Sequence, residues 1–344
     1  MSDDIDIRVT GQAGRITLNR PDALNAVTHD MCLAIEVALD GWATNDGVAL
    51  VVIDAAGDKA FSAGGDITDM YRTASAGDYD YGRKFWADEY RLNAKIFNFP
   101  KPYVAFMQGF TMGGGVGISC HGSHRITCEN TQIAMPECGI GLVPDVGGSL
   151  LLSRAPGRLG EYLGTTGTRM GPGDAIFAEF ADYFVARDKW ADLIGALEAF
   201  GDLNLIDQVA QTPPDSPLQT IQPDIDSHFA GETIADIIRS LTHTPDDFTR
   251  ASLKTLNRHS PLSLACAIEM IHRIRGTDSI MRALDLEYRF TYRAAEHGDF
   301  IEGIRAAIID KDRTPKWQHP TINDVRPFET SKMLMPLGEN ALKL

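Results

Sequence analysis

The chain has 344 residues and a formal net charge of −15, from 47 acidic and 32 basic side chains. This length allows one large domain or a core domain with a smaller appendage. The acidic balance argues against nucleic-acid binding, which needs a basic surface. A phosphate-bearing ligand stays possible, because local basic residues and helix N-termini can hold phosphate on an acidic protein.

Neither the N-terminus nor the cysteines indicate secretion. The first residues, MSDDIDIRVTGQAG, are acidic and lack an apolar run, and no stretch approaches the length of a membrane span. The five cysteines form no C-x-x-C pair, as expected for packed, reduced thiols of a cytosolic protein. We therefore expect a cytoplasmic protein with no targeting segment, no membrane contact and no metal site.

The first two thirds of the chain alternate strand and helix patterns. IDIRVTGQAGRITLNRP predicts a hairpin around a Gln-Ala-Gly turn, and THDMCLAIEVALDGWATN predicts a helix capped by Thr28. VALVVIDAAG and KPYVAFMQGF are apolar runs that predict buried strands. RKFWADEYRLNAKIFN predicts a helix after a loop around YRTASAGDYDYG, in which residues 75–81 are a candidate lid, and HRITCEN and TQIAM predict two further short strands.

This alternation predicts an α/β fold with a core over residues 1–200. The pattern weakens after that, and QTPPDSPLQTIQPD is typical of a loop, so residues 201–245 are expected to be an irregular connecting segment. Residues 246–344 contain apolar side chains at spacings of three and four, which predict a helical C-terminal region.

Two glycine clusters each follow a predicted strand. FSAGGDI spans residues 61–67, and TMGGGVG spans residues 111–117 at the expected start of a helix. Each could be merely a tight turn. If parallel strands bring them together, however, two backbone N–H groups can point at one oxygen and form an oxyanion hole.

Two acidic residues stand in AMPECGIGLVPDVGGS, where no lysine or arginine is near to pair with them. Glu137 and Asp145 are either surface turn residues or parts of an active site. Cys138 lies beside Glu137, but no motif around it supplies a base, so we interpret it as a packed thiol. His121 and His124 have no acid at useful spacing and are expected to be core or helix-end residues.

FSAGGDI, KPYVAFMQGFTMGGGVGIS and AMPECGIGLVPDVGGSLLLSR, in this order, resemble the enoyl-CoA hydratase/isomerase (crotonase) superfamily. The resemblance implies a spiral of ββα units that binds acyl-CoA thioesters and holds the thioester carbonyl with two backbone N–H groups. In this sequence those groups would belong to Gly65 and Gly114.

The chain departs from the hydratases of that family at two positions. Their second glutamate matches Glu137, but Gly117 stands where they carry another glutamate, and a glycine cannot transfer a proton. Asp145 replaces a residue that is usually small. This exchange, with EYRLN, EYRF and EHGDFIEGIRAAIIDKDRTPKW, resembles the 3-hydroxyisobutyryl-CoA hydrolase branch, and the similarity covers about residues 19–317.

The branch resemblance implies hydrolysis of a 3-hydroxyacyl-CoA in valine breakdown. Glu137 would activate water or attack the carbonyl directly, and Asp145 would bind the 3-hydroxyl group, orient water or pass a proton to the leaving thiolate. The remaining positions assigned to the substrate and to CoA are Glu89, Asp66, Ile67, Thr68, Ala23, Leu24 and Asn25. On the sequence alone Glu89 is an ordinary solvated helix residue. No cofactor is expected, because coenzyme A belongs to the substrate.

Two other functions stay open. An enoyl-CoA hydratase or isomerase would not release thiol; Gly117 argues against a hydratase, whereas an isomerase with Glu137 as its base is compatible with the sequence. A non-catalytic acyl-CoA-binding protein would bind without turnover. The resemblance also implies a homo-oligomer, either a trimer or hexamer, or a smaller assembly if the longer C-terminal region covers the trimer surface.

Overall fold

The computed structural model describes residues 3–344 and divides into two compact units, each made from three stretches of sequence. The first unit comprises residues 1–66, 91–134 and 169–219, and the second comprises residues 67–90, 135–168 and 220–344. The predicted division at residues 200 and 245 follows sequence pattern and stays a prediction. Among the described helices, none combines the length and apolarity needed to cross a bilayer.

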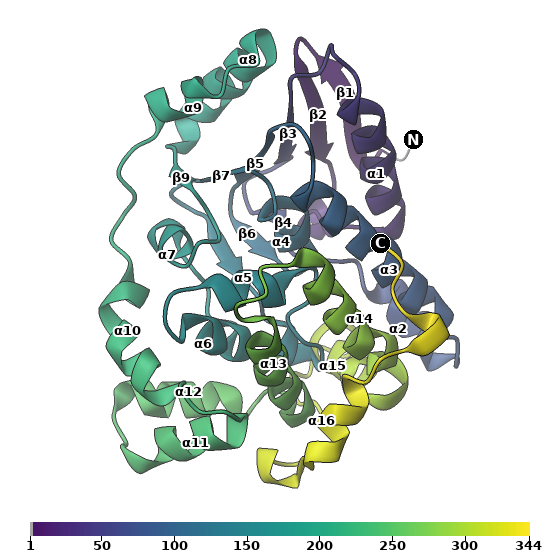
Figure 1. Ribbon diagram of the computed structural model, residues 1–344, viewed down its shortest axis with the longest axis vertical. Coiled ribbons are helices and arrows are strands. Elements are labelled where there is room, and N and C mark those ends of the chain that lie inside the picture. Colours follow the sequence, from purple (N-terminus) through teal and green to yellow (C-terminus); the bar gives the residue numbers. More distant parts are fainter. Residues whose placement is uncertain (1–2) are drawn as a thin grey trace. The chain divides into compact units, whose positions relative to one another are not determined.

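The first unit contains a six-stranded sheet in the order β1-β2-β3-β5-β7-β9 (Figure 1). Its strands are β1 (Ile5–Thr10), β2 (Ala13–Leu18), β3 (Leu50–Ala55), β5 (Tyr103–Met107), β7 (His124–Thr127) and β9 (Tyr183–Phe184). Only the β1–β2 pair is antiparallel among them. The predicted hairpin is confirmed, but its turn is Gly11–Gln12 rather than Gln-Ala-Gly, because Thr10 pairs with Ala13 and Gly11 adopts a positive φ of 55°.

A second, parallel sheet of three short strands lies in the same unit, in the order β4 (Ala60–Ser62), β6 (Phe110–Met112), β8 (Gln132–Ala134). Each of these strands directly follows one strand of the large sheet along the chain, giving the pairs β3–β4, β5–β6 and β7–β8. Helices come after each pair, so the predicted spiral of ββα units is confirmed. Strand β5 is buried along its whole length, as its continuous apolar run predicts.

Helices α1 (His29–Ala43), α4 (Gly114–Ser119), α7 (Pro172–Phe177), α8 (Trp190–Phe200) and α9 (Asn204–Val209) belong to the first unit, with short 3₁₀ turns η1 (Pro21–Ala23) and η3 (Arg187–Lys189). Thr28 caps α1 by accepting a hydrogen bond from the Met31 N–H, as predicted. Trp190 and Leu197 of α8 pack with Val52 and Phe106 of the large sheet in the core of this unit.

The second unit is largely helical. Its elements are α2 (Thr68–Ser75), the first part of α3 (Asp80–Phe97), η2 (Glu137–Ile140), α5 (Gly148–Arg154), α6 (Leu159–Thr166), most of α10 (Pro217–His228), α11 (Ile234–His243), α12 (Asp247–Leu256), α13 (Pro261–Ile274), α14 (Ile280–His297), α15 (Phe300–Ile304), the π-helical turn η4 (Arg305–Ile309), η5 (Ile322–Asp324), α16 (Pro327–Met333) and η6 (Gly338–Asn340). The predicted helical C-terminal region is therefore confirmed. The loop expected before α3 shrinks to residues 76–79, because α2 extends to Ser75.

The expectation of an irregular segment over residues 201–245 is wrong, because α9, α10 and α11 occupy much of it. Helix α10 begins at Pro217, a first-turn position that proline tolerates, and it even contains Pro223. Leu218, Ile225 and Phe229 are buried on this segment at helical spacing. Burial of that apolar stripe outweighs the cost of the internal proline, which sequence propensity had weighted more heavily.

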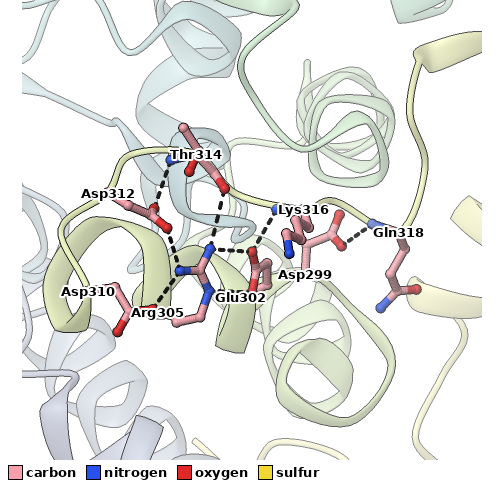
Figure 2. A network of polar contacts seen from close by, with 8 residues as sticks. All are labelled: Asp299, Glu302, Arg305, Asp310, Asp312, Thr314, Lys316 and Gln318. Carbon is pink, nitrogen blue, oxygen red and sulfur yellow. Dashed lines mark hydrogen bonds and ion pairs between the residues drawn. The ribbon is translucent and has the colours of Figure 1, made fainter.

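Residues 310–318, here called the C-terminal strap, run beside α15 and are held by the guanidinium of Arg305 (Figure 2). Arg305 donates a two-point hydrogen bond to the Glu302 carboxylate at 2.7 and 2.8 Å and also bonds Asp310 and Asp312. The same Glu302 carboxylate accepts the Lys316 backbone N–H at 2.6 Å. The Arg305–Glu302 pair therefore holds a segment that has no regular secondary structure, with Arg305 bonded near its start and Glu302 bonded at Lys316.

Candidate active site

The two glycine clusters meet in the first unit, because β4 and β6 are parallel neighbours and each cluster follows one of them. A Cβ added to Gly115 would lie 2.6 Å from the Ser62 carbonyl oxygen, and one added to Gly64 would lie 3.3 Å from the Met112 carbonyl oxygen. Gly64 also has a φ of 114°, which L-residues rarely adopt. Both glycines are therefore required by the close approach of the two backbones.

The backbone N–H groups of the predicted pair, Gly65 and Gly114, have no protein acceptor among the described residues. Gly65 forms a parallel bridge with Val27 through its neighbours: the Val27 N–H donates to the Gly64 carbonyl, and the Asp66 N–H donates to the Val27 carbonyl, both at 2.8 Å. The Gly65 N–H takes no part in this bridge. Gly114 is the first residue of α4, where backbone N–H groups have no intrahelical partner.

The predicted CoA-binding segment over residues 20–28 lies in the same unit. Leu24 and Asn25 both adopt positive φ, and Asn25 is buried with its side-chain amide donating to the carbonyls of Ala56 and Ala60. Asn25 also lines an open cavity of about 160 Å³ with Pro21 and residues 56–60. Its side chain thus holds the framework of this cavity, while the exposed Ala23 and half-buried Leu24 stand beside it.

Asp66 pairs with Arg20 at 3.1 Å, so its carboxylate is engaged within the first unit. Ile67 and Thr68 begin the second unit, where Ile67 precedes the first turn of α2 and Thr68 is the first, exposed residue of that helix. Their role in CoA binding stays a prediction.

The acidic residues cluster in the second unit. Glu137 is the first residue of η2, Asp145 lies in the turn before α5, Glu89 lies on α3, and Glu287 lies on α14. All four side chains are buried, with exposed fractions between 0% and 4%. Four buried carboxyl groups in one unit are costly, because desolvation disfavours their charged forms.

Burial raises the pKa values of the carboxyl groups in this cluster. Desolvation is the largest cause in each case: it raises the pKa of Asp145 to about 7, that of Glu89 to about 8 and that of Glu137 well above its ordinary value. The Asp145 charge raises the pKa values of Glu89 and Glu137 further. Carboxyl groups that titrate near neutrality can accept and donate protons at physiological pH, as acid–base catalysis requires.

Hydrogen bonds distinguish the members of the cluster. Asp145 accepts a bond of 2.7 Å from the Tyr90 hydroxyl, which lowers the pKa of Asp145 against the effect of burial. By contrast, Oε2 of Glu137 and Oε1 of Glu89 are buried without a hydrogen-bond partner among the described residues. Buried polar atoms are rarely left unsatisfied, so these two oxygens are candidates to contact a ligand or water.

The sequence interpretation of Glu89 as a solvated helix residue is wrong. Glu89 is 3% exposed because its face of α3 also carries the buried Phe85, Trp86 and Tyr90. His121 is buried near the end of α4 with its ring edge against Phe97, and the half-buried His124 stacks on Tyr183, so the expectation of structural histidines agrees with their places. Cys138 is fully buried, and burial raises its pKa well above the ordinary value, which opposes a nucleophilic role.

Three residues of the cluster were missed from the sequence: Tyr90, Ser149 and Glu287. Glu287 accepts the backbone N–H groups of Gly147 and Ser149 at 2.7 and 2.9 Å, together with the Ser149 hydroxyl. A signal for it exists, because Glu287 interrupts the apolar spacing of Ala283, Leu284 and Ala294 along α14. A charged residue on a buried helix face is unusual enough to mark a site.

The chain is similar to known proteins over nearly its whole length. A family model described as enoyl-CoA hydratase/isomerase matches residues 13–334. The protein named 3-hydroxyisobutyryl-CoA hydrolase, mitochondrial, is 36% identical in Gallus gallus and 35% identical in Homo sapiens, in both cases over 99% of this chain and 91% of the relative.

Two solved structures match nearly the whole chain. One, described as an enoyl-CoA hydratase from Rhodobacter sphaeroides, is 55% identical with a TM-score of 0.96 and covers 99% of this chain and 100% of its own. The other, described as a carnitinyl-CoA dehydratase from Mycobacterium thermoresistibile, is 39% identical with a TM-score of 0.94 and covers 98% and 97%. The family match over most of the chain and these full-length relatives show that the chain belongs to the enoyl-CoA hydratase/isomerase family.

Proposed function

We propose that this protein hydrolyses the thioester of 3-hydroxyisobutyryl-CoA to CoA and 3-hydroxyisobutyrate, as a step of valine breakdown. One observation carries the choice within the family: Glu137 and Asp145 are both buried in the acidic cluster, while Gly117 stands where the resemblance places the other hydratase glutamate. The full-length relatives named 3-hydroxyisobutyryl-CoA hydrolase support the same choice.

The N–H groups of Gly65 and Gly114 hold the thioester oxygen in this proposal. Attack on the carbonyl carbon moves negative charge onto that oxygen, and two oriented donors stabilise it by roughly 3–4 kcal/mol each. Their lack of a protein acceptor among residues 3–344 supports this role. CoA itself is assigned to the segment with Ala23, Leu24 and Asn25 and to Asp66, Ile67 and Thr68; the cavity at Asn25 supports the first part.

Glu137 either removes a proton from the attacking water or attacks the carbonyl carbon itself to give a mixed anhydride that water then cleaves. Both routes break the C–S bond and consume one water per thioester. The leaving thiolate takes up a proton, and Asp145, with a pKa of about 7, is suited to supply it. Hydroxylamine added during turnover traps an anhydride as a hydroxamate on Glu137, which separates the two routes.

Asp145 and Glu89 are also assigned to the 3-hydroxyl group of the substrate. A buried acceptor that meets a hydroxyl is left unpaired by an acyl chain without one, so the enzyme should discriminate strongly against such chains. Glu89 Oε1, buried and without a partner among the described residues, supports this role.

The test is release of free thiol from 3-hydroxyisobutyryl-CoA, measured beside hydration of crotonyl-CoA. Rapid thiol release that is lost in Glu137→Gln supports the hydrolase. Hydration of crotonyl-CoA without thiol release would overturn it in favour of a hydratase, the activity by which the Rhodobacter sphaeroides relative is named. Double-bond migration would favour an isomerase, and binding without turnover a non-catalytic protein.

We further propose that the protein acts in the cytoplasm, although the named relatives are mitochondrial, and that it needs neither metal nor cofactor. Its expected assembly is a trimer, a hexamer or a smaller oligomer. Cell fractionation, activity in the presence of a chelator and light scattering test these three expectations.

A further inference from the structure

We propose that Glu287 is a positioning residue for the reaction, which fixes the turn that carries Asp145. This inference rests on the proposed function, because it concerns how Asp145 is aimed. It is carried by contacts within the second unit alone.

The turn from Asp145 to Gly148 has an unfavourable backbone. The Gly148 N–H donates to the Asp145 carbonyl at 2.6 Å, and both central residues have positive φ, 53° at Val146 and 80° at Gly147. Turns with two such residues favour Gly, Asn and Asp at these places. A β-branched residue in this conformation is strained by roughly 1–3 kcal/mol and persists only where its surroundings determine it.

Glu287 holds the turn in this strained conformation. Its Oε2 accepts the Gly147 N–H at 2.7 Å, and its Oε1 accepts the Ser149 N–H at 2.9 Å and the Ser149 hydroxyl. The two backbone groups flank Gly148, and Gly147 directly follows the strained valine. One side chain from a long helix thus binds the turn at two successive points, which a lone backbone hydrogen bond could not do.

Burial of the Glu287 carboxyl group lowers the stability of the fold, which argues for a function. The side chain is 0% exposed, and desolvation raises its pKa to about 8 while the bonds from Ser149 and Gly147 lower it. Its charge also raises the pKa of Glu137. An apolar side chain on this face of α14 would pack without these costs, but it would leave the Gly147 and Ser149 N–H groups unsatisfied.

Through this turn, Glu287 controls the orientation of the Asp145 side chain. The Asp145 carboxylate is held on one oxygen by Tyr90, and its backbone is held by the turn. Loss of the Glu287 bonds would let Val146 relax toward ordinary backbone angles. This would move the Asp145 Cα, so that the Asp145 carboxylate leaves the orientation in which it bonds Tyr90. Displacement of a catalytic group by about 1 Å can cost roughly 100-fold in rate.

The test compares Glu287→Gln with Glu161→Gln. Glutamine can keep only part of the bonds, since its NH₂ group must face one of the donors. Glu161 is an equally buried carboxylate on α6, and its ion-pair partners among the described residues, Arg158, His272 and Arg275, lie in the same unit but outside the acidic cluster. It therefore controls for the general cost of altering a buried carboxylate.

We expect Glu287→Gln to lower kcat for thiol release by about 10- to 100-fold with KM changed by less than about 3-fold. Ser149→Ala, which removes only the hydroxyl donor, should lower kcat by less, and its effect should largely vanish in the Glu287→Gln background. Glu161→Gln should lose stability but keep kcat. Unchanged kcat in folded Glu287→Gln, or an equal loss in Glu161→Gln, would overturn the role of Glu287.

A second readout does not depend on the substrate. Amide hydrogen exchange at Gly147 and Ser149 in the substrate-free protein should be faster in Glu287→Gln, because glutamine cannot accept both N–H groups. The same two amides should exchange in Glu161→Gln as they do in the wild type. Unchanged exchange at both amides in Glu287→Gln would count against the inference even if the wild type proved not to be a hydrolase, and the failure of the two proposals is thereby distinguished.

Discussion

The hydroxyl of Tyr90 donates a hydrogen bond of 2.7 Å to Oδ2 of Asp145, and both groups are buried. Tyr90 neighbours Glu89 on α3, so one turn of helix supplies both a partner for Asp145 and a second carboxyl group. The bond favours the charged form of Asp145 within a cluster whose burial disfavours it.

Tyr90→Phe should therefore raise the pKa of Asp145 above about 7 while leaving the fold intact. We expect a loss of roughly 1 kcal/mol in the free energy of unfolding. The pH profile of kcat should move toward higher pH. Steady-state thiol release across about pH 5–9 measures this shift, and an unmoved profile would show that the bond does not tune Asp145.

Glu137→Gln should abolish most activity, because an amide can neither accept the proton of water nor attack a carbonyl. A fall in kcat of at least about 1,000-fold is expected, with substrate binding retained. Calorimetric titration with a substrate analogue measures binding. Residual thiol release near the wild-type rate would assign the catalytic base to another residue.

The acid side of the wild-type pH profile should lie well above the ordinary pKa of a carboxyl group, about 4. A base must be deprotonated to act, and burial raises the pKa of Glu137 well above its ordinary value. Activity should therefore rise with pH as Glu137 loses its proton, and the alkaline side should fall as Asp145, the proton donor with a pKa of about 7, loses its own. A rate that is already maximal at about pH 5 would contradict these shifts.

Glu89→Gln should stabilise the substrate-free protein at high pH. Burial raises the pKa of Glu89 to about 8, above its value in the unfolded chain, so the stability it contributes is present at low pH and lost as the pH rises through the folded pKa. The free energy of unfolding of the wild type should therefore fall between about pH 4 and pH 8, and Glu89→Gln should remove on the order of 3 kcal/mol of that fall. Urea unfolding at both pH values tests it, with exposed Glu339→Gln as the matched control.

Gly115→Ala should separate the two glycine segments, because its Cβ would lie 2.6 Å from the Ser62 carbonyl oxygen. The expected result is a loss of about 100-fold or more in kcat with some loss of stability. Gly41→Ala is the control: apart from its own stretch of helix α1, no atom of the described residues lies within 4 Å of the added Cβ, and alanine should stabilise the helix by up to about 1 kcal/mol. Normal turnover in Gly115→Ala would count against the proposed oxyanion hole.

The sequence predicted the spiral, the glycine clusters and the two acids because these depend on local patterns and a family resemblance. It missed α10, because two prolines weighed more than the apolar stripe of Leu218, Ile225 and Phe229 that burial rewards. The sequence also predicted wrongly that Glu89 is exposed to solvent. The run ADEYRLN has too many polar residues to show which face of the helix is buried, and only tertiary packing decides that.

Glu287 and Tyr90 could not be assigned roles in the same way. Both contact the Asp145 turn from positions 55 or more residues away in sequence. The Tyr90 hydroxyl donates to Asp145, and the Glu287 carboxylate accepts the N–H groups of Gly147 and Ser149. A buried polar residue on an apolar stripe indicates that a partner exists, but the stripe does not identify it. Long-range hydrogen bonds become visible only in the folded chain.

The left-handed valine of the Asp145 turn also has a consequence for protein engineering. Glycine adopts this conformation without strain, so Val146→Gly looks like a stabilising repair. Val146 is only 1% exposed, however, and its removal would leave a cavity in the core and a more flexible unfolded chain. The strained valine therefore serves packing and the geometry of the turn together, and an engineer who removes it loses both.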